Sequence, residues 1–212
     1  MPDMTQQTDR WSLVMPVKRV ENAKTRLDLD VEARAALAVA MAVDTAAAAL
    51  TCRRVSHVVV VTDDRRAREA LAPLGVQLVP DVPDAGLNAA LVHGVTAAAN
   101  GHVAALSSDL PALRGADLAV VLDRAAEHDL SVVADVPGTG TTLLCARSAA
   151  MFEPRFGVAS LAAHVAAGAT DLTDLAPESV RRDVDTLDGL RAAVALGIGD
   201  ATRRALADLP VL

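Results

Sequence analysis

Aromatic side chains are nearly absent from this 212-residue chain, which has one tryptophan, two phenylalanines and no tyrosine. Proteins that bind single-stranded nucleic acid stack the bases on several aromatic rings, so this composition excludes a stacking platform. The chain also has no excess of basic residues, because its formal net charge is −7. A nucleic-acid backbone needs a basic face. We therefore expect no nucleic-acid partner, although a few local cations can still hold a small anion.

Cysteine is equally scarce. Cys52 and Cys145 belong to no CxxC pair and to no Cys/His cluster, which gives no zinc motif and favours a reduced, cytoplasmic protein. No apolar run is expected to reach the ~20 residues of a membrane span, so we expect no membrane partner. Residues 1–10 are polar and lack the hydrophobic region of a signal peptide. They are expected to form a disordered tail ahead of a single domain over 11–212.

Several nucleotide-binding and catalytic motifs are missing from the sequence. No GxGxxG follows the first predicted strand, which disfavours an NAD-linked dehydrogenase, and there is no GxxxxGK[ST] phosphate loop. No G-x-S-x-G nucleophile elbow is present. The five histidines have no mutual spacing that indicates a metal site.

Apolar residues, in contrast, make up 52% of the chain. Strand-like runs such as 56–62 and 102–106 alternate with helical segments such as 31–50 and 88–100. This alternation predicts βαβ units with right-handed crossovers. We expect a Rossmann-like α/β fold with a mixed, mostly parallel sheet and helices on both faces. A last strand is predicted at 180–184.

The segment 13–27, LVMPVKRVENAKTRL, joins a short apolar strand to a cluster of basic residues. Lys18 and Lys24 are the only lysines in the chain, and Arg19 and Arg26 lie beside them. Ligands of open α/β sheets bind at the carboxyl ends of the strands, so a cationic loop here is suited to a phosphate. A solvated basic patch is the alternative interpretation.

Three acidic residues are expected near the same edge of the sheet. Asp109 follows the strand at 102–106, and Asp183 and Asp185 belong to the last predicted strand. Residues i and i+2 of a strand point to one face, so the latter two carboxylates should converge. Oxygen ligands without His or Cys suit Mg²⁺. Alternatively, aspartates at strand ends cap helices or form turns.

Three further segments have both a functional and a structural interpretation. The loop 137–142, PGTGTT, has glycines that allow successive amides to bind an anion, or it is simply a hairpin loop. Gly157 and Ser160 lie where an anion could meet a helix N-terminus, yet Ser160 could also cap that helix. Asn88 is expected to cap the helix at 88–100, or to contact the edge of a base.

Taken together, these segments resemble the 2-phospho-L-lactate guanylyltransferases, whose actinobacterial members are phosphoenolpyruvate guanylyltransferases of coenzyme F-420 biosynthesis. The matching segments, in the same order, are PVKRVENAKTRL (16–27), LNAAL (87–91), SSDLPAL (107–113), ADVPGTGTTLLCA (134–146), PRFG (154–157) followed by Ser160, and RDVDT (182–186). The resemblance covers nearly the whole chain and implies a fold similar to molybdenum-cofactor guanylyltransferases. Those relatives carry a glycine-rich loop where this chain has residues 15–18.

The resemblance also implies roles for individual residues. The carboxylates that would hold Mg²⁺ are Asp109, Asp183 and Asp185. The residues that would hold the phosphate of the acceptor are Lys18, Thr141, Gly157 and Ser160. The residues that would contact GTP are Lys24 and Arg26 at its phosphates and Asn88 at the guanine. With Lys18, the three aspartates would be the catalytic residues.

The implied reaction moves GMP from GTP to a small phosphorylated three-carbon acid and releases pyrophosphate. Phosphoenolpyruvate is the acceptor that the resemblance favours, and 2-phospho-L-lactate, 3-phosphoglycerate or a molybdopterin are the alternatives. A nucleotide-sensing module without turnover is the alternative of another class. A monomer or a homodimer is expected.

Overall fold

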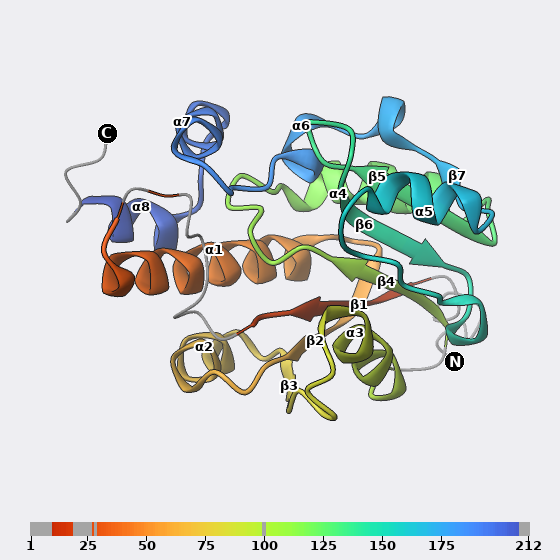
Figure 1. Cartoon of the computed structure of the whole chain (residues 1–212), viewed down its shortest axis with the longest axis horizontal. Helices are drawn as coiled ribbons and strands as arrows, with labels where there is room; N and C mark the ends of the chain where they lie inside the picture. The colour runs from red at the N-terminus through yellow and green to blue at the C-terminus, as the bar shows by residue number, and fades with distance from the viewer. Residues whose placement is uncertain (1–9, 19–26, 28, 99–100, 208–212) are drawn as a thin grey trace, which may run out of the picture.

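The computed structural model describes residues 10–18, 27, 29–98 and 101–207. Its centre is a seven-stranded sheet with the strand order β3-β2-β1-β4-β6-β5-β7 (Figure 1). The strands are β1 (Trp11–Pro16), β2 (Val55–Val61), β3 (Gln77–Val79), β4 (His102–Leu106), β5 (Leu130–Ala134), β6 (Thr141–Ala146) and β7 (Thr170–Asp171). The prediction of a mixed, mostly parallel sheet is confirmed, and β7 is a strand that the sequence did not indicate.

Strand direction decides which side chains meet at the edge of the sheet. β1 is parallel to both β2 and β4, β3 is parallel to β2, and β7 is parallel to β5. β6 runs antiparallel to β4 and β5. The first residue of β6 therefore lies at the same edge as the last residues of β1 and β4. Segments that are distant in the sequence converge at this edge.

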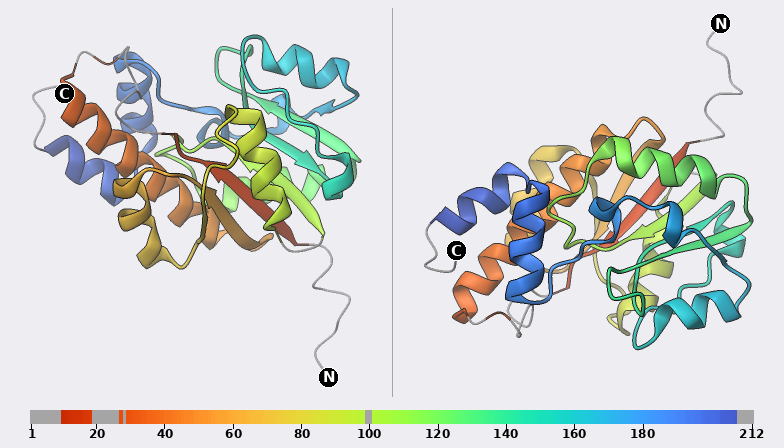
Figure 2. Two further views of the ribbon diagram at one scale, coloured as in Figure 1. Left: turned by 60° about the horizontal axis from the view of Figure 1, so that its bottom comes forward. Right: turned by 90° about the horizontal axis from the view of Figure 1, so that it is seen from above.

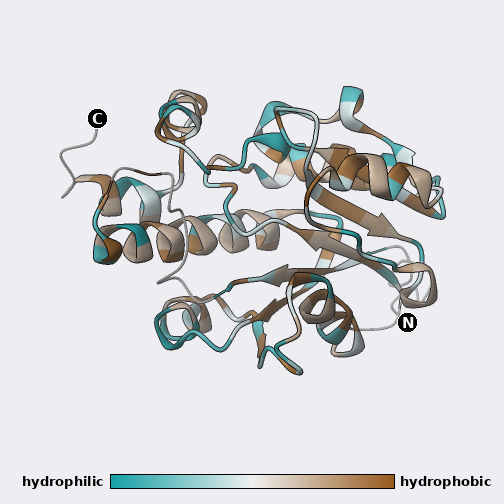
Figure 3. Cartoon of the chain, in the orientation of Figure 1, coloured by the Kyte–Doolittle hydropathy of each residue, from teal (hydrophilic) through white to brown (hydrophobic). Residues whose placement is uncertain are grey.

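The helices cover both faces of the sheet (Figure 2). They are α1 (Val31–Thr51), α2 (Arg65–Leu71), α3 (Leu87–Thr96), α4 (Gly115–Ala125), α5 (Ser160–Ala166), α6 (Glu178–Arg181), α7 (Leu187–Leu196) and α8 (Asp200–Ala207). Because successive side chains of a strand point to opposite faces, Leu13 and Met15 pack with α1 and α4, whereas Val14 packs with α3. Figure 3 shows the resulting contrast between apolar strands and the hydrophilic α2.

The long helix α1 corrects one expectation from the sequence. Its 21 residues are long and apolar enough to cross a membrane by length and composition alone, so the expectation that no apolar run reaches the length of a membrane span is wrong. Core helices meet the same criterion, and eight residues of α1 are buried. The carboxylate of Asp44 accepts hydrogen bonds from the backbone N–H groups of Ala201 and Thr202, which fastens α8 to α1.

Two other expectations are wrong. Residues 180–184 form no strand, because α6 occupies Glu178–Arg181 and irregular backbone follows it. The apolar pair Val180 and Val184 is spaced by four, which suits a helical turn as well as a strand. Helix α3 begins one residue earlier than expected, with Gly86 at its N-cap, so Asn88 is not the cap. The expected tail lies, apart from Arg10, outside the described residues.

We predict that Gly94→Ala destabilises the protein by about 1–3 kcal/mol, because an added methyl group overpacks a filled core. A Cβ atom at Gly94 would overlap Cγ1 of Val14 and lie 2.7 Å from Cγ2 of Val61. The matched control is Gly189→Ala in α7, where the nearest atom would lie 3.4 Å away. This control should be neutral or stabilising by up to about 1 kcal/mol. Urea unfolding checks both values, and equal unfolding midpoints for the two variants would contradict the packing argument.

Candidate active site

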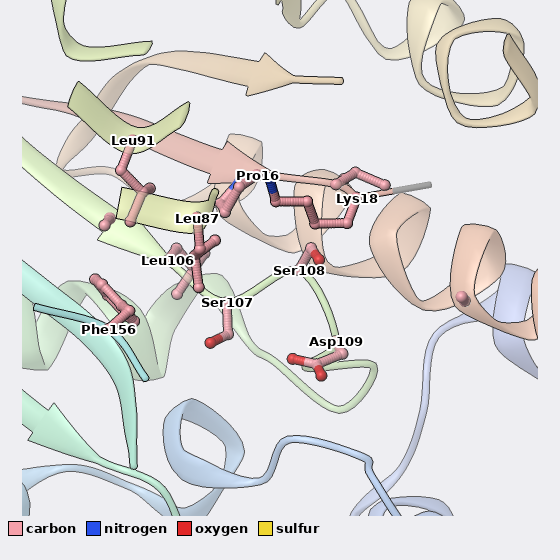
Figure 4. Close-up of a pocket in the computed structure, with 12 residues that line it drawn as sticks. Pro16, Lys18, Leu87, Leu91, Leu106, Ser107, Ser108, Asp109 and Phe156 are labelled. Atoms are coloured by element: carbon pink, nitrogen blue, oxygen red, sulfur yellow. The ribbon is translucent and has the colours of Figure 1, made fainter. Parts of the chain in front are cut away.

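A cavity of about 260 Å³ opens at the edge where β1 and β4 end (Figure 4). Leu87, Leu91 and Phe156 contribute to its apolar lining. Among the described residues, the polar side chains that line it are those of Lys18, Ser107, Ser108 and Asp109. In Figure 4, Lys18 and the Asp109 carboxylate lie on opposite sides of the space. The structure thus brings a predicted cation and a predicted carboxylate to one cavity.

Lys18 is held in place by an ion pair. Its Nζ atom lies 3.0 Å from Oδ2 of Asp81, and its side chain is 44% exposed. Asp81 is itself buried, and its second carboxylate oxygen, Oδ1, has no hydrogen-bond partner among the residues that the structure describes. The backbone N–H of Asp81 donates to Asp63. The ammonium of Lys18 is therefore partly neutralised before any ligand arrives.

The other basic residues of the opening segment cannot be placed. Arg19, Lys24 and Arg26 lie outside the described residues. Their expected contact with GTP phosphates stays a prediction from the sequence.

The three predicted metal ligands lie on neighbouring backbone segments. The N–H of Val184 donates to the carbonyl oxygen of Asp109 at 3.1 Å, which places Asp183 and Asp185 on either side of this contact. Asp109 and Asp183 are half-buried, and Asp185 is exposed. Asp183 and Asp185 do not belong to a strand, so the two-residue period of a strand gives no reason for their carboxylates to converge.

Within the part of the chain that the structure describes, no three His, Cys, Asp or Glu side chains form a ready-made metal cluster. Mg²⁺ commonly uses only one or two carboxylates and takes its other ligands from water and substrate phosphates. The carboxylate oxygens of Asp109, Asp183 and Asp185 are ligands of the type that this ion prefers. In the described part of the chain, these three aspartates do not form a closed metal cage.

The glycine- and threonine-rich loop is a hairpin connection between β5 and β6. The Asp135 carboxylate accepts hydrogen bonds from the backbone N–H groups of Thr139 and Gly140, both at 2.9 Å. Gly138 adopts φ = 76° and donates to the Asp135 carbonyl. The amides of Thr139 and Gly140 thus hold a carboxylate of their own chain, as the hairpin-loop interpretation allows, and phosphate binding by this loop stays a prediction.

Thr141 and Ser160 meet in a buried hydrogen-bond network with His164. The Ser160 hydroxyl donates to Oγ1 of Thr141 at 3.0 Å, and Nδ1 of His164 lies 3.1 Å from the same oxygen. Nε2 of His164 accepts the backbone N–H of Arg155 at 2.8 Å. Ser160 does not cap α5, because the N-cap residue is Ala159. The network joins β6, α5 and the segment 152–159.

His164 is a residue of this network that the sequence did not reveal. It is fully buried, and its ring meets Phe156 edge-on at 5.1 Å. Burial lowers the pKa of His164, and the charge of Arg155 lowers it further, while a hydrogen bond with the backbone of Ser160 acts in the opposite direction. The one local signal was the spacing of four between Ser160 and His164, which places both on one face of a helix.

Asn88, in the first turn of α3, binds the segment 152–159 that contains Gly157. The Asn88 side chain accepts the N–H of Phe156 at 2.8 Å and donates to its carbonyl at 3.1 Å. These two bonds fix the start of α3 to the segment 152–159. The Asn88 carboxamide is therefore engaged with the backbone of Phe156. Its contact with guanine, which the family resemblance implies, stays a prediction. Gly157 is exposed and has φ = 141°.

Solved structures with a similar fold include a nucleotidyl transferase and a synthetase bound to CTP. A nucleotidyl transferase from Methanothermobacter aligns with a TM-score of 0.61 and 21% identity, over 89% of this chain and 98% of that chain. A CMP:2-keto-3-deoxy-manno-octonic acid synthetase complexed with CTP aligns with a TM-score of 0.54 and 17% identity, over 88% of this chain and 98% of that chain. The fold defined by the sheet and its helices is that of a nucleotidyltransferase.

Sequence comparison gives the family. The model of the family described as "Guanylyl transferase CofC like" matches residues 11–194. A phosphoenolpyruvate guanylyltransferase of Thermomonospora curvata is 49% identical, over 94% of this chain and 90% of that protein. The enzyme of the same name from Streptomyces coelicolor is 48% identical, over 94% and 97%. This chain belongs to the CofC-like guanylyl transferase family, as its motifs indicated.

We predict that Asp135→Asn destabilises the β5–β6 hairpin. The carboxylate accepts two backbone N–H groups, whereas a carboxamide has one oxygen and would direct its own N–H₂ at an N–H donor. The loss should be about 1–3 kcal/mol in the free energy of unfolding. Chemical denaturation measures it, with Asp174→Asn, at an exposed aspartate, as the control. A loss no larger than that of the control would show that the carboxylate does not hold the loop.

We also predict that neutral His164 makes stability depend on pH. The pKa of the buried ring is lowered in the folded state, so the unfolded chain takes up the proton first as the pH falls. The stabilisation is complete above about pH 6.5 and is lost as the pH falls through the folded pKa. Unfolding free energies measured from about pH 7 to about pH 5 should fall more steeply for the wild type than for His164→Asn. Parallel curves would contradict this linkage.

Proposed function

We propose that the protein transfers GMP from GTP to the phosphate of phosphoenolpyruvate, as a step in coenzyme F-420 biosynthesis. Family membership supports a guanylyl transfer, and relatives that are 47–49% identical carry the name phosphoenolpyruvate guanylyltransferase. The observation that carries the proposal is the cavity that has Lys18 on one side and Asp109 on the other. The buried free thiols Cys52 and Cys145 suit a cytoplasmic location.

The proposed reaction is a direct displacement at phosphorus. An oxygen of the acceptor phosphate attacks the α-phosphorus of GTP, the new P–O–P bond forms, and the bond to the β-phosphate breaks to release pyrophosphate. A phosphate monoester carries about −1.5 to −2 charges at pH 7, so the nucleophile needs no general base. This reaction suits a cavity whose polar lining is a lysine, two serines and an aspartate.

The main barrier is the repulsion between two polyanions. Two unit charges 4 Å apart repel by about 4 kcal/mol at an effective dielectric constant of 20, and several such pairs meet here. We propose that Lys18 reduces this repulsion at the acceptor, and that Lys24 and Arg26 do so at the GTP phosphates. Thr141, Gly157 and Ser160 are the proposed further contacts of the acceptor phosphate.

We propose Mg²⁺ as the cofactor and Asp109, Asp183 and Asp185 as the residues that would hold it. A bound divalent ion would supply positive charge at the developing phosphate oxygens. One related solved structure, from Mycobacterium tuberculosis, is a complex with manganese (TM-score 0.56, 18% identity, covering 89% of this chain and 99% of that chain). The fixed contact between Asp109 and Val184 keeps the three aspartates on adjoining segments.

The acceptor is tested by mixing the purified protein with GTP, Mg²⁺ and one acid at a time. Phosphoenolpyruvate should release pyrophosphate faster than 2-phospho-L-lactate or 3-phosphoglycerate at equal concentrations. Mass spectrometry should identify the guanylylated acid. Faster release with another acid would replace the proposed acceptor, and binding of GTP without release for any acid would favour a nucleotide-sensing module.

We predict that Asp109→Asn lowers guanylyl transfer by at least about a hundredfold, since removing one electrostatic contact in a phosphoryl-transfer site costs about 3 kcal/mol or more. Its fold should survive, because Asp109 is only half-buried. Asp129→Asn is the control. This exposed aspartate pairs with Arg147 at the ends of β5 and β6 that lie away from the cavity. Pyrophosphate release and a urea unfolding curve are measured for both variants. Full activity of Asp109→Asn would overturn its assignment.

A further inference from the structure

His164 is a buried titratable residue that no part of the proposed reaction uses. We propose that it is a positioning residue for the acceptor phosphate: its ring, fixed with the proton on Nδ1, leaves one hydroxyl hydrogen of the Thr141–Ser160 pair free to donate to a phosphate oxygen. The inference rests on the proposed function, which assigns the acceptor phosphate to this pair. Nothing in the sequence motifs gives His164 a role.

The backbone of Arg155 determines the tautomer of His164. Its N–H group points at Nε2 of the ring at 2.8 Å, and an N–H donor requires an unprotonated nitrogen as its acceptor. A neutral imidazole carries its single proton on the other nitrogen, so Nδ1 is the donor. Oγ1 of Thr141 lies 3.1 Å from Nδ1 and cannot donate to this protonated nitrogen, which also has the backbone of Ser160 as a hydrogen-bond partner.

The tautomer of His164 decides how many hydroxyl hydrogens of Thr141 and Ser160 are available to a ligand. Thr141 and Ser160 together carry two hydroxyl hydrogens, and one of them forms the bond between the two side chains. Because Nδ1 is a donor, it cannot accept the other hydrogen. One hydroxyl hydrogen of the pair therefore remains for a ligand. With the opposite tautomer, Nδ1 would accept this hydrogen, and the pair would present only lone pairs to an anion.

The neutral ring is protected by its surroundings. His164 is fully buried against the edge of Phe156, and the charged group that faces it from the neighbouring segment is Arg155. A second proton on the ring would set an N–H on Nε2 against the N–H of Arg155. That conflict and the lowered pKa both keep His164 neutral. The segment that carries Arg155 is itself fastened to α3 by Asn88.

Two substitutions separate the two functions of the ring. The amide of His164→Asn can place an N–H donor near the position of Nδ1, which keeps the bond to Thr141 and loses the acceptor for Arg155. The amide of His164→Gln reaches the position of Nε2, which keeps the acceptor and loses the donor. The matched control is His128→Gln, because Nδ1 of His128 also pairs with a threonine hydroxyl, that of Thr170, at an exposed position.

The test measures binding of phosphoenolpyruvate by calorimetry and steady-state kinetics for the wild type and the three variants. His164→Gln should weaken phosphoenolpyruvate binding about 10-fold, because Oγ1 of Thr141 loses the Nδ1 donor that orients its hydroxyl and the free hydrogen is no longer held toward the ligand. Its KM for GTP should stay within about twofold. His164→Asn should retain binding within about threefold, and His128→Gln should match the wild type. Unchanged binding by folded His164→Gln would overturn the proposal.

Nitrogen NMR of the imidazole rings supplies a readout that does not depend on activity or on the folding of a variant. The wild type should show His164 protonated at Nδ1 and unprotonated at Nε2. The opposite tautomer, or a doubly protonated ring at pH 7, would overturn the proposal. Failure of the proposed function is distinguishable: the wild type would then bind phosphoenolpyruvate without turnover, or bind none at all, while the ring spectrum would still decide the tautomer.

Discussion

The parallel pairing of β1 with β2 on one side and β4 on the other is the constraint on which the site depends. It brings Lys18 and Asp109, which are far apart in the sequence, to one cavity at the carboxyl edge of the sheet. The antiparallel β6 then starts at the same edge and delivers Thr141. A nucleotidyltransferase must gather two phosphate-bearing substrates, and this edge collects the residues that can meet both.

Charge is the second constraint. The chain carries a net charge of −7, yet its proposed substrates are polyanions, so each cation near the cavity matters. The pairing of Lys18 with Asp81 holds a cation in position while no phosphate is bound. The same ion pair engages Nζ of Lys18 with a carboxylate, and an oxygen of the acceptor phosphate, not the lysine, is the nucleophile that we propose. These features favour direct transfer between the two substrates over a covalent guanylyl–lysine intermediate.

Much of the sheet could be predicted from the sequence, because β-branched runs alternate with helical segments, and Lys18 and Asp109 follow strands that are easily recognised. The remaining features depend on contacts that no local pattern reveals. Residues 180–184 have an apolar spacing that fits either a strand or a helical turn. The carboxylate of Asp135 fills a loop that, by composition alone, indicates an anion site. His164 acquires its role from partners 9 and 23 residues away.

Direct, in-line transfer of GMP to the acceptor phosphate is tested most sharply by the stereochemistry at the α-phosphorus. GTP with one sulfur at the α-phosphate, in a single configuration, is supplied with phosphoenolpyruvate, and the configuration of the guanylylated product is determined by phosphorus NMR. One displacement predicts inversion. Retention would require two displacements through a guanylylated side chain and would contradict the account.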